Sequence, residues 1–367
     1  MAYATLVRDN STLAAALERL RGAQRLALDT EFMRESTYHA QLCLVQVASD
    51  QASFLFDPLA GIDLAGVHAL LQDRQRPKIV HAARQDLEVL NTAGGAVPGP
   101  IFDTQVAAAL LGLPPQVGYA ELVARKLGHS IDKGQTRTDW SRRPLSPEQL
   151  AYAGNDVHYL LELHTLLVAE LQALGRSDWH AEDCAALEDP ALYRVDPAES
   201  SRRLKGLNRL SPSAQAIART LAEWRERWAI ADDRPRGWIL SDEALYGIAT
   251  VAPATIEELL QVRSLPPGVV KRRGTELLER IAAAAHAPAA TAASPAGSKP
   301  PPEEVARAAR LMRAVRERAE TLGISAEVLA IRRDVDALAA DPHHEGRLQR
   351  GWRGTALGDA LRAAALG

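Results

Sequence analysis

The chain has 367 residues, of which 47% are hydrophobic and 24% are charged, as in an ordinary soluble globular protein. Its length allows two or three domains, and its net charge of −3 argues against a protein that coats nucleic acid non-specifically, although not against an enzyme with local basic patches. No apolar run is long enough to span a membrane and no leader-like segment opens the chain. Two cysteines, Cys43 and Cys184, argue against a disulfide framework or a zinc knuckle and indicate a reducing cytoplasm.

The first part of the chain predicts a helix followed by a meander of strands. An amphipathic helix over 11–21 begins at Asn10 or Ser11. Strand-like apolar runs follow over 26–32, 42–48 and 53–56. Short apolar runs that succeed one another in this way favour adjacent strands of one sheet.

Two acids interrupt the first of these strands. Side chains alternate between the two faces of a strand, so Asp29 and Glu31 point to one face, while Thr30 and Phe32 point to the other. Burying two neighbouring carboxylates is costly unless their charge is compensated. A divalent cation such as Mg²⁺ or Mn²⁺ supplies that compensation through hard oxygen ligands. The alternative is an edge strand with a solvated acidic face.

Strands and helices then alternate, which indicates an α/β domain with a mixed sheet. We expect helices over 64–71 and 84–91, strands over 78–82 and 101–103, and a helix that ends at Leu111. Asp86 falls in the first turn of the helix over 84–91, a position where α/β sheets collect ligand-binding residues. Taken alone, an acid there is explained more simply by the positive N-terminus of the helix.

One helix is predicted over 147–174, with Ser146 as its N-cap and Gln149 completing a capping box. Tyr152 and Asp156 are four residues apart and therefore share a face of this helix. An aspartate on a largely apolar face needs a partner, which suggests a functional role. A satisfied Tyr and Asp at the boundary of an ordinary amphipathic helix explains the pair equally well.

The rest of the chain is predicted to be helical. A polar connector over 176–205 precedes helices that we expect over 212–229, 242–249, 254–262 and 268–284. An Ala/Pro-rich segment has the composition of a linker and leads into a second helical segment. The predicted boundaries are 1–200 for an α/β domain, 206–288 for a helical domain, 289–302 for the linker and 303–367 for a second helical domain.

Together, these motifs resemble a known family. Asp29-x-Glu31, Asp86 in a His-Ala-Ala-Arg-Gln-Asp run and Tyr152-x-x-x-Asp156 resemble the three exonuclease motifs of the DEDD superfamily, in its DEDDy branch. The first and last blocks are similar to those of the ribonuclease D family. Residues 233–240 resemble part of the HRDC domain, and 311–367 look like a diverged second copy. The resemblance implies an α/β ribonuclease H-like (DnaQ-like) exonuclease domain with a mixed sheet, followed by two small all-α HRDC-type domains.

The resemblance also implies an activity and a cofactor. The family's members are 3′-5′ exoribonucleases that hydrolyse phosphodiesters with two divalent metal ions, Mg²⁺ or Mn²⁺, and release nucleoside 5′-monophosphates. By resemblance, Asp29 bridges the two metals, Glu31 and Asp156 complete the first site, and Asp86 holds the second. Tyr152 completes the catalytic set, and we expect it to orient the attacking water, because a phenol titrates near pH ~10 and is a poor base.

Further residues are candidate RNA contacts. Those near the catalytic motifs or in the loop before the helix over 147–174 are Thr30, Phe32, Gln46, His81, Lys133, Gln135, Arg137 and Arg143. Trp238, in the HRDC-like segment, is a candidate stacking platform. A lone histidine at a strand end is more often a structural hydrogen-bonding group. The loop cations are equally explained as solvated charge, and Trp224 and Trp228 are better explained as core.

The partners that the resemblance implies are RNA 3′ ends, tRNA precursors and other structured small RNAs. We expect no membrane association, no obligate protein partner and a monomeric enzyme. Two other functions remain open on the motifs alone. One is a single-strand DNA 3′-exonuclease in repair, and the other is a catalytically silent RNA-binding scaffold.

Overall fold

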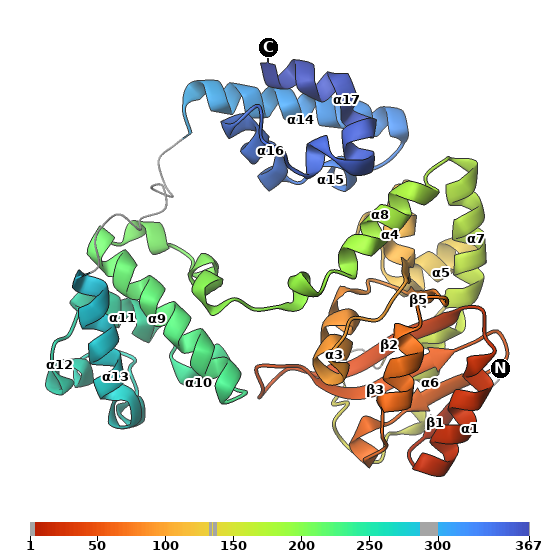
Figure 1. Cartoon of the computed structure of the whole chain (residues 1–367), viewed down its shortest axis with the longest axis horizontal. Coiled ribbons are helices and arrows are strands. Elements are labelled where there is room, and N and C mark those ends of the chain that lie inside the picture. The colour runs from red at the N-terminus through yellow and green to blue at the C-terminus, as the bar shows by residue number, and fades with distance from the viewer. Residues whose placement is uncertain (1–3, 132–133, 135–137, 287–299, 367) are drawn as a thin grey trace. The chain divides into compact units, whose positions relative to one another are not determined.

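The structure is a computed structural model that describes residues 4–131, 134, 138–286 and 300–366 (Figure 1). The chain divides into two compact units. Unit 1 comprises Met1–Met33, Leu42–Tyr193 and Pro300–Gly367, and unit 2 comprises Arg34–Gln41 and Arg194–Lys299. None of the described helices combines the length and the apolar character needed to cross a membrane.

Unit 1 is built on a mixed six-stranded sheet, which confirms the predicted class. The strands are β1 (Thr5–Val7), β2 (Leu26–Met33), β3 (Gln41–Ala48), β4 (Ser53–Phe56), β5 (Lys78–Val80) and β6 (Ile101–Asp103). Their order is β1-β4-β3-β2-β5-β6. β3 and β4 are antiparallel, whereas β1 with β4, β2 with β5 and β5 with β6 are parallel pairs. The predicted meander is confirmed, and β2, which carries the two acids, is an inner strand rather than an edge.

Helices pack around this sheet (Figure 1). They are α1 (Asn10–Arg21), α2 (Ala65–Gln72), α3 (Arg84–Gly94), α4 (Thr104–Leu110), α5 (Tyr119–Leu127), α6 (Pro147–His158), α7 (Leu160–Ala173) and α8 (Ser177–Leu187). α6 begins where predicted, because Ser146 and Gln149 form the expected capping box. β1 and α5 were not predicted, since three residues are too few to show the alternation of a strand and α5 follows a stretch without clear capping signals.

Two predictions about the helices of unit 1 were wrong. The single helix expected over 147–174 is two helices, α6 and α7, separated at Tyr159. The expected polar connector over 176–205 contains α8 and two 3₁₀ helices, Pro190–Tyr193 and Pro197–Arg203. α8 escaped prediction because it buries only His180 and Cys184 and so lacks an apolar stripe.

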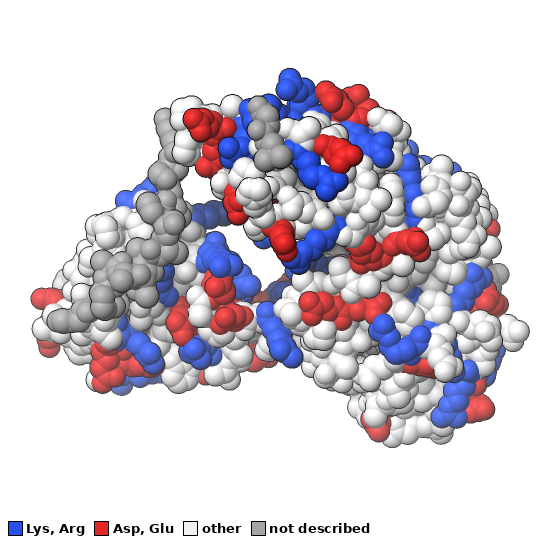
Figure 2. Space-filling model, turned by 45° about the horizontal axis from the view of Figure 1, so that its top comes forward, with Lys and Arg blue, Asp and Glu red and all other residues white. Residues whose placement is uncertain are grey.

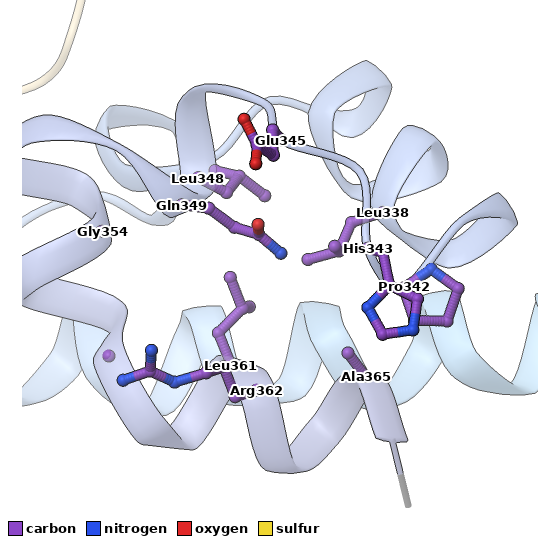
Figure 3. A pocket seen from close by; sticks show the side chains of 11 residues that line it. Leu338, Pro342, His343, Glu345, Leu348, Gln349, Gly354, Leu361, Arg362 and Ala365 are labelled. Atoms are coloured by element: carbon purple, nitrogen blue, oxygen red, sulfur yellow. The ribbon is translucent and has the colours of Figure 1, made fainter.

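The C-terminal segment of unit 1 is a small helical module, residues 300–366. Its helices are α14 (Pro302–Leu322), α15 (Ala326–Leu329), α16 (Arg332–Ala340) and α17 (Gly351–Leu366), with a 3₁₀ helix at Arg347–Gln349 before α17. The backbone of α17 kinks at Gly358, where φ is 45°. Figure 3 shows Leu338, Leu348 and Leu361 around a pocket of about 410 Å³ in this module.

The C-terminal module packs directly on the exonuclease part of unit 1. Its buried residues belong to the same hydrophobic cluster as the buried faces of α4 and α7. Trp352 stacks on Trp179 of α8 with ring centroids 4.5 Å apart. Arg353 binds both carboxylate oxygens of Asp183, at 2.5 and 2.9 Å, and is itself buried. Gly351 begins α17 with a φ of 54°, in the left-handed region that favours glycine.

In the part of unit 2 that the structure describes, the regular elements are helices, apart from Gln41 at the start of β3; the loop 34–40 connects β2 to β3. Its helices are α9 (Pro212–Ala231), α10 (Arg236–Ile239), α11 (Asp242–Val251), α12 (Ile256–Leu260) and α13 (Pro267–His286). Trp224 is buried in its core and Trp228 packs against that core, as predicted. Within the unit, Glu226 is almost fully buried and accepts hydrogen bonds from Tyr38 of the loop and from Arg236.

Charges of both signs are mixed on the face of the protein drawn in Figure 2. On the face drawn in Figure 2, Lys and Arg side chains lie among Asp and Glu side chains, and no broad area carries one sign. This agrees with the small net charge and leaves local patches as the basis for any contact with nucleic acid.

Candidate active site

The inner strand β2 and the first turn of α3 bring three acids to one place. Asp29 and Glu31 project from one face of β2, as the alternation of a strand requires. Thr30 projects from the other face, and its hydroxyl donates a hydrogen bond of 2.5 Å to Oδ1 of Asp86. Asp86 is buried. β2 therefore presents the carboxylates of Asp29 and Glu31 to the pocket. The hydroxyl of Thr30, which lies between these two residues in the sequence, orients the carboxylate of Asp86.

The turn that leads into α3 is fixed by a further aspartate. Ala82 has a φ of 58°, which is unusual for a residue with a side chain. The carboxylate of Asp103, at the end of β6, accepts hydrogen bonds from the amides of Ala82 and Ala83, at 3.1 and 2.8 Å. This carboxylate holds the tight turn from which Asp86 follows.

Helix α6 supplies the remaining two predicted residues. Tyr152 and Asp156 lie one turn apart, and the Tyr152 side chain hydrogen-bonds the Asp156 carboxylate. The ring of Tyr152 lies 6.0 Å from the buried ring of Trp140. The predicted helix face that carries Tyr152 and Asp156 is therefore directed to the site. Tyr152 is one partner of the Asp156 carboxylate.

A pocket of about 260 Å³ unites all five predicted catalytic residues. It is lined by Asp29, Thr30, Glu31, Phe32, His81, Ala82, Gln85, Asp86, Tyr119, Tyr152, Asp156 and Leu160. Carboxylate oxygens of Asp29, Glu31 and Asp156 lie within 4.8 Å of one another. Among the described residues, no Lys or Arg lines this pocket. A donor set of oxygens with no cationic side chain beside it suits a hard divalent cation.

The proton affinities of these carboxylates are raised. Burial raises the pKa of Asp156 to about 7 and that of Glu31 to about 9, and neighbouring acids add to both shifts. Burial also raises the pKa of Asp86 to about 7, against the opposing effect of the Thr30 hydrogen bond. The pKa of Asp29 lies well above its usual range because of burial, with Asp86, Asp156 and Glu31 contributing. Without a cation, the site therefore resists full ionisation near neutral pH.

Three of the candidate RNA contacts, Thr30, Phe32 and His81, line the pocket. The nitrogens of His81 are both engaged by protein, Nδ1 with Thr104 Oγ1 at 2.9 Å and Nε2 with the Val117 carbonyl at 3.0 Å. Burial lowers the pKa of His81, which favours the neutral ring. Nε2–H is the donor in the bond to Val117, because a carbonyl oxygen only accepts. Because both ring nitrogens bond to protein groups, His81 is better explained as a structural hydrogen-bonding residue than as an RNA contact.

Two other candidates, Gln46 and Arg143, do not line the pocket. Gln46 is fully buried in β3 and is not among the residues that line the pocket. Arg143 binds both carboxylate oxygens of Asp57 at 2.7 Å and also donates to the carbonyl of Cys43. These bonds fasten the loop before α6 to the sheet, which gives Arg143 a structural role in this conformation.

The last candidates cannot be placed in the pocket. Lys133, Gln135 and Arg137 lie outside the described residues. Trp238 belongs to unit 2, where its side chain is 62% exposed, so its ring is available for stacking. As RNA contacts, these four residues remain predictions.

Sequence reasoning missed Tyr119, Gln85 and Leu160 as pocket residues. Leu160 follows Asp156 by four residues, so helical spacing from that acid could have found it. Gln85 directly precedes Asp86, and adjacent helical residues do not share a face, so spacing gave no signal for it. Tyr119 opens α5, far along the chain from any motif, and only its tertiary position reveals it.

Comparison with known proteins assigns the chain to a family. A family model described as 3′-5′ exonuclease matches residues 4–172, and a model of the HRDC domain matches residues 214–281. A ribonuclease D of Gluconacetobacter diazotrophicus is 40% identical over 361 residues, which cover 98% of this chain and 92% of the relative. The chain belongs to the ribonuclease D family. A ribonuclease D of Pseudomonas paraeruginosa is 36% identical and covers 97% of this chain and 96% of its own.

A solved structure agrees with this ribonuclease D assignment. The crystal structure of Escherichia coli RNase D, described as an exoribonuclease involved in structured RNA processing, superposes with a TM-score of 0.88. Its sequence is 31% identical, and the match covers 98% of each chain. The predicted fold class, a DnaQ-like exonuclease domain followed by a helical HRDC region, is confirmed. As a member of the ribonuclease D family, the chain is a 3′-5′ exoribonuclease.

Proposed function

We propose that the pocket removes nucleotides from RNA 3′ ends with two divalent cations, Mg²⁺ or Mn²⁺, and releases nucleoside 5′-monophosphates. One observation carries the proposal. The carboxylates of Asp29, Glu31 and Asp156 converge within 4.8 Å in a pocket that no described cationic side chain lines. Such a concentration of buried negative charge is unfavourable by itself and becomes favourable around cations.

The donor set fits this cofactor. Asp29, at the centre of the cluster, would contact both cations, with Glu31 and Asp156 completing one site and Asp86 the other. Two divalent cations, when bound, would activate the attacking water and stabilise the charge on the leaving 3′ oxygen. The hydrogen bond from Thr30 keeps Asp86 in one orientation, and the hydrogen bond from Tyr152 does the same for Asp156.

Tyr152 also has a role toward the reacting groups. Tyr152 lines the pocket, and its hydroxyl gives its single proton to the hydrogen bond with Asp156, so an oxygen lone pair remains to accept a hydrogen bond from the attacking water. We assign it to holding the attacking water in line with the scissile phosphate. A phenol, whose ordinary pKa is about 10, remains protonated while it does so.

The proposed substrates are tRNA precursors and other structured small RNAs. The E. coli relative is described as processing structured RNA, and the present chain shares its fold over 98% of its length. The HRDC domain in unit 2 carries the exposed Trp238, which suits stacking on an unpaired base. The pocket residues themselves do not distinguish RNA from DNA, so this substrate class rests on the relatives.

The test is an assay of a tRNA extended at its 3′ end, incubated with Mg²⁺, Mn²⁺ or a chelator. We expect stepwise release of 5′-mononucleotides with either cation and none with the chelator. Asp29→Asn should lower turnover by at least about 1,000-fold, because it removes charge from the centre of the cluster. Asp178→Asn, an exposed acid on α8, is the matched control and should retain wild-type turnover.

Two results would contradict the proposal. One is cleavage that persists in the chelator, and the other is substantial turnover by Asp29→Asn. A DNA oligomer of the same sequence, assayed in parallel, tests the substrate class, and faster turnover on DNA would favour a repair exonuclease instead.

A further inference from the structure

The hydroxyl of Tyr119 lies inside the break between α6 and α7. It accepts a hydrogen bond from the Tyr159 amide at 3.1 Å and donates one to the Asn155 carbonyl at 3.2 Å. In a continuous α-helix, the amide of residue 159 would donate directly to the carbonyl of residue 155. Here the hydroxyl stands between these two groups. A side chain inserted into the helical hydrogen-bond ladder is an established cause of a break.

The break lies beside the catalytic residues. Asn155 directly precedes Asp156, and Tyr152 lies one turn earlier on the same helix. Tyr119 also lines the pocket that contains Asp29 and Asp156. Its hydroxyl therefore bonds the last turn of α6 at the point from which the Asp156 side chain leaves the backbone.

The ring of Tyr119 is itself held in place. It packs against the ring of His81, with centroids 5.7 Å apart. His81 is fixed in turn by Thr104 and by the carbonyl of Val117, two residues before Tyr119. Burial raises the pKa of Tyr119 well above its usual range, so the hydroxyl keeps its proton and can donate and accept at the same time.

We propose that Tyr119 is a positioning residue for Asp156. By occupying the broken turn, its hydroxyl sets the direction in which the end of α6 presents the Asp156 carboxylate to the cation site. The inference rests on the proposed function, because it takes Asp156 as a cation ligand. Partners that orient a ligand commonly change metal affinity or activity by 10- to 100-fold when they are removed.

The experiment compares Tyr119→Phe with Tyr193→Phe in the full chain. Tyr193 is the matched control, because its hydroxyl also donates to a backbone carbonyl of unit 1, that of Leu187, but does not line the pocket. Turnover and KM are measured on a short RNA oligomer, and Mn²⁺ binding is measured separately by electron paramagnetic resonance without RNA. Thermal unfolding verifies that each variant is folded.

For Tyr119→Phe we expect a 10- to 100-fold lower kcat, an unchanged KM and a Mn²⁺ affinity weaker by a similar factor. Tyr193→Phe should match the wild type in all three quantities. A folded Tyr119→Phe with wild-type kcat and Mn²⁺ binding overturns the inference. Should Tyr119→Phe not fold, Thr104→Val, which removes the hydroxyl that holds His81, is used under the same criterion.

Asp156→Asn separates this inference from the proposed function. If Asp156→Asn loses cleavage and Mn²⁺ binding while Tyr119→Phe keeps both, only the role of Tyr119 fails. If Asp156→Asn keeps wild-type turnover, the proposed function fails and the inference fails with it.

Discussion

At the scale of single residues, the pocket depends on carboxylates that burial makes costly to ionise. The pKa values of Asp86 and Asp156 are raised to about 7 and that of Glu31 to about 9, with desolvation as the main cause in each case. In the metal-free protein, burial therefore favours the protonated form of these carboxyl groups. Bound cations would favour the ionised form instead, because they compensate its charge.

This gives a prediction about stability and pH. Acids with raised folded-state pKa values contribute stability that is fully present below their unfolded pKa, near pH ~4, and that is lost as the pH rises through about 7 and then about 9. The metal-free protein should therefore lose stability across this range. Saturating Mn²⁺ should raise Tm by at least about 4 °C more at pH 8.5 than at pH 6.

Differential scanning calorimetry with Mn²⁺ and with a chelator measures this difference. Asp29→Asn serves as the control, because it should remove most of the Mn²⁺ effect. A Tm difference between Mn²⁺ and chelator that stays the same from pH 6 to pH 8.5 would show that the acids of the pocket do not bind the cation.

A second prediction at this scale concerns Tyr152. Tyr152→Phe should lower kcat about 100-fold, because the attacking water loses the hydroxyl that orients it. Mn²⁺ binding should be retained, with an affinity that falls by a smaller factor, because Asp156 also loses its hydrogen bond from Tyr152. The measurement is turnover on a short RNA oligomer together with Mn²⁺ titration. Unchanged turnover would remove Tyr152 from the mechanism, and a large loss of Mn²⁺ affinity would mean that it acts mainly through Asp156.

Individual residues differed in how far sequence alone could place them. Asp29 and Glu31 were recognisable because two acids in an apolar strand are anomalous, and the structure directs both into the pocket. Gln46 and Arg143 carried no comparable signal. Whether such polar groups face a substrate or a neighbouring strand depends on tertiary contacts, such as the Arg143–Asp57 pair, that local sequence does not specify.

At the scale of elements, α8 shows what periodicity misses. Its few buried residues include His180 and Cys184, so it lacks an apolar stripe, yet it provides Asp183 to the C-terminal module. The break between α6 and α7 was equally hidden. The sequence over 147–174 is compatible with one helix, and the break holds the hydroxyl of Tyr119, a residue of another element that local sequence does not bring there.

The contact between α8 and α17 carries a prediction about stability. Arg353→Met should lower the free energy of unfolding by about 3 kcal/mol, because Asp183 loses its bidentate partner and the buried carbonyl of Val328 loses its donor. Asp183 keeps the hydrogen bond from the Trp352 indole and the longer ion pair with Arg347. Arg332→Met, which breaks the exposed pair with Asp336 on α16, is the matched control and should cost less than about 0.5 kcal/mol. Urea denaturation measures both. Equal effects of the two substitutions would show that the α8–α17 contact adds no stability.

At the scale of the whole molecule, the two units differ in how they are built. The C-terminal module shares one hydrophobic cluster with the exonuclease helices, whereas unit 2 has a core of its own. We still propose that 303–367 is a diverged second HRDC-type domain. The succession of a long helix, a short helix and a medium helix in α9–α11 recurs in α14–α16, which supports this proposal.

Unit 2 carries a prediction about substrate choice. Trp238→Ala should raise KM for a structured RNA about 10-fold, because a stacked base loses its platform, and should leave turnover of a short oligomer unchanged. Val251→Ala, another exposed apolar side chain of unit 2, is the control. Kinetics on both substrates provide the measurement. An equal KM for structured RNA in Trp238→Ala and the wild type would leave Trp238 without a role in binding.

The most direct test of the central claim is anomalous diffraction from crystals of the wild-type protein grown with Mn²⁺. We expect two anomalous peaks in the pocket, coordinated by carboxylates of Asp29, Glu31 and Asp156 and with Asp86 nearby. An absence of anomalous density among these carboxylates at saturating Mn²⁺, with the four side chains ordered, would contradict the account.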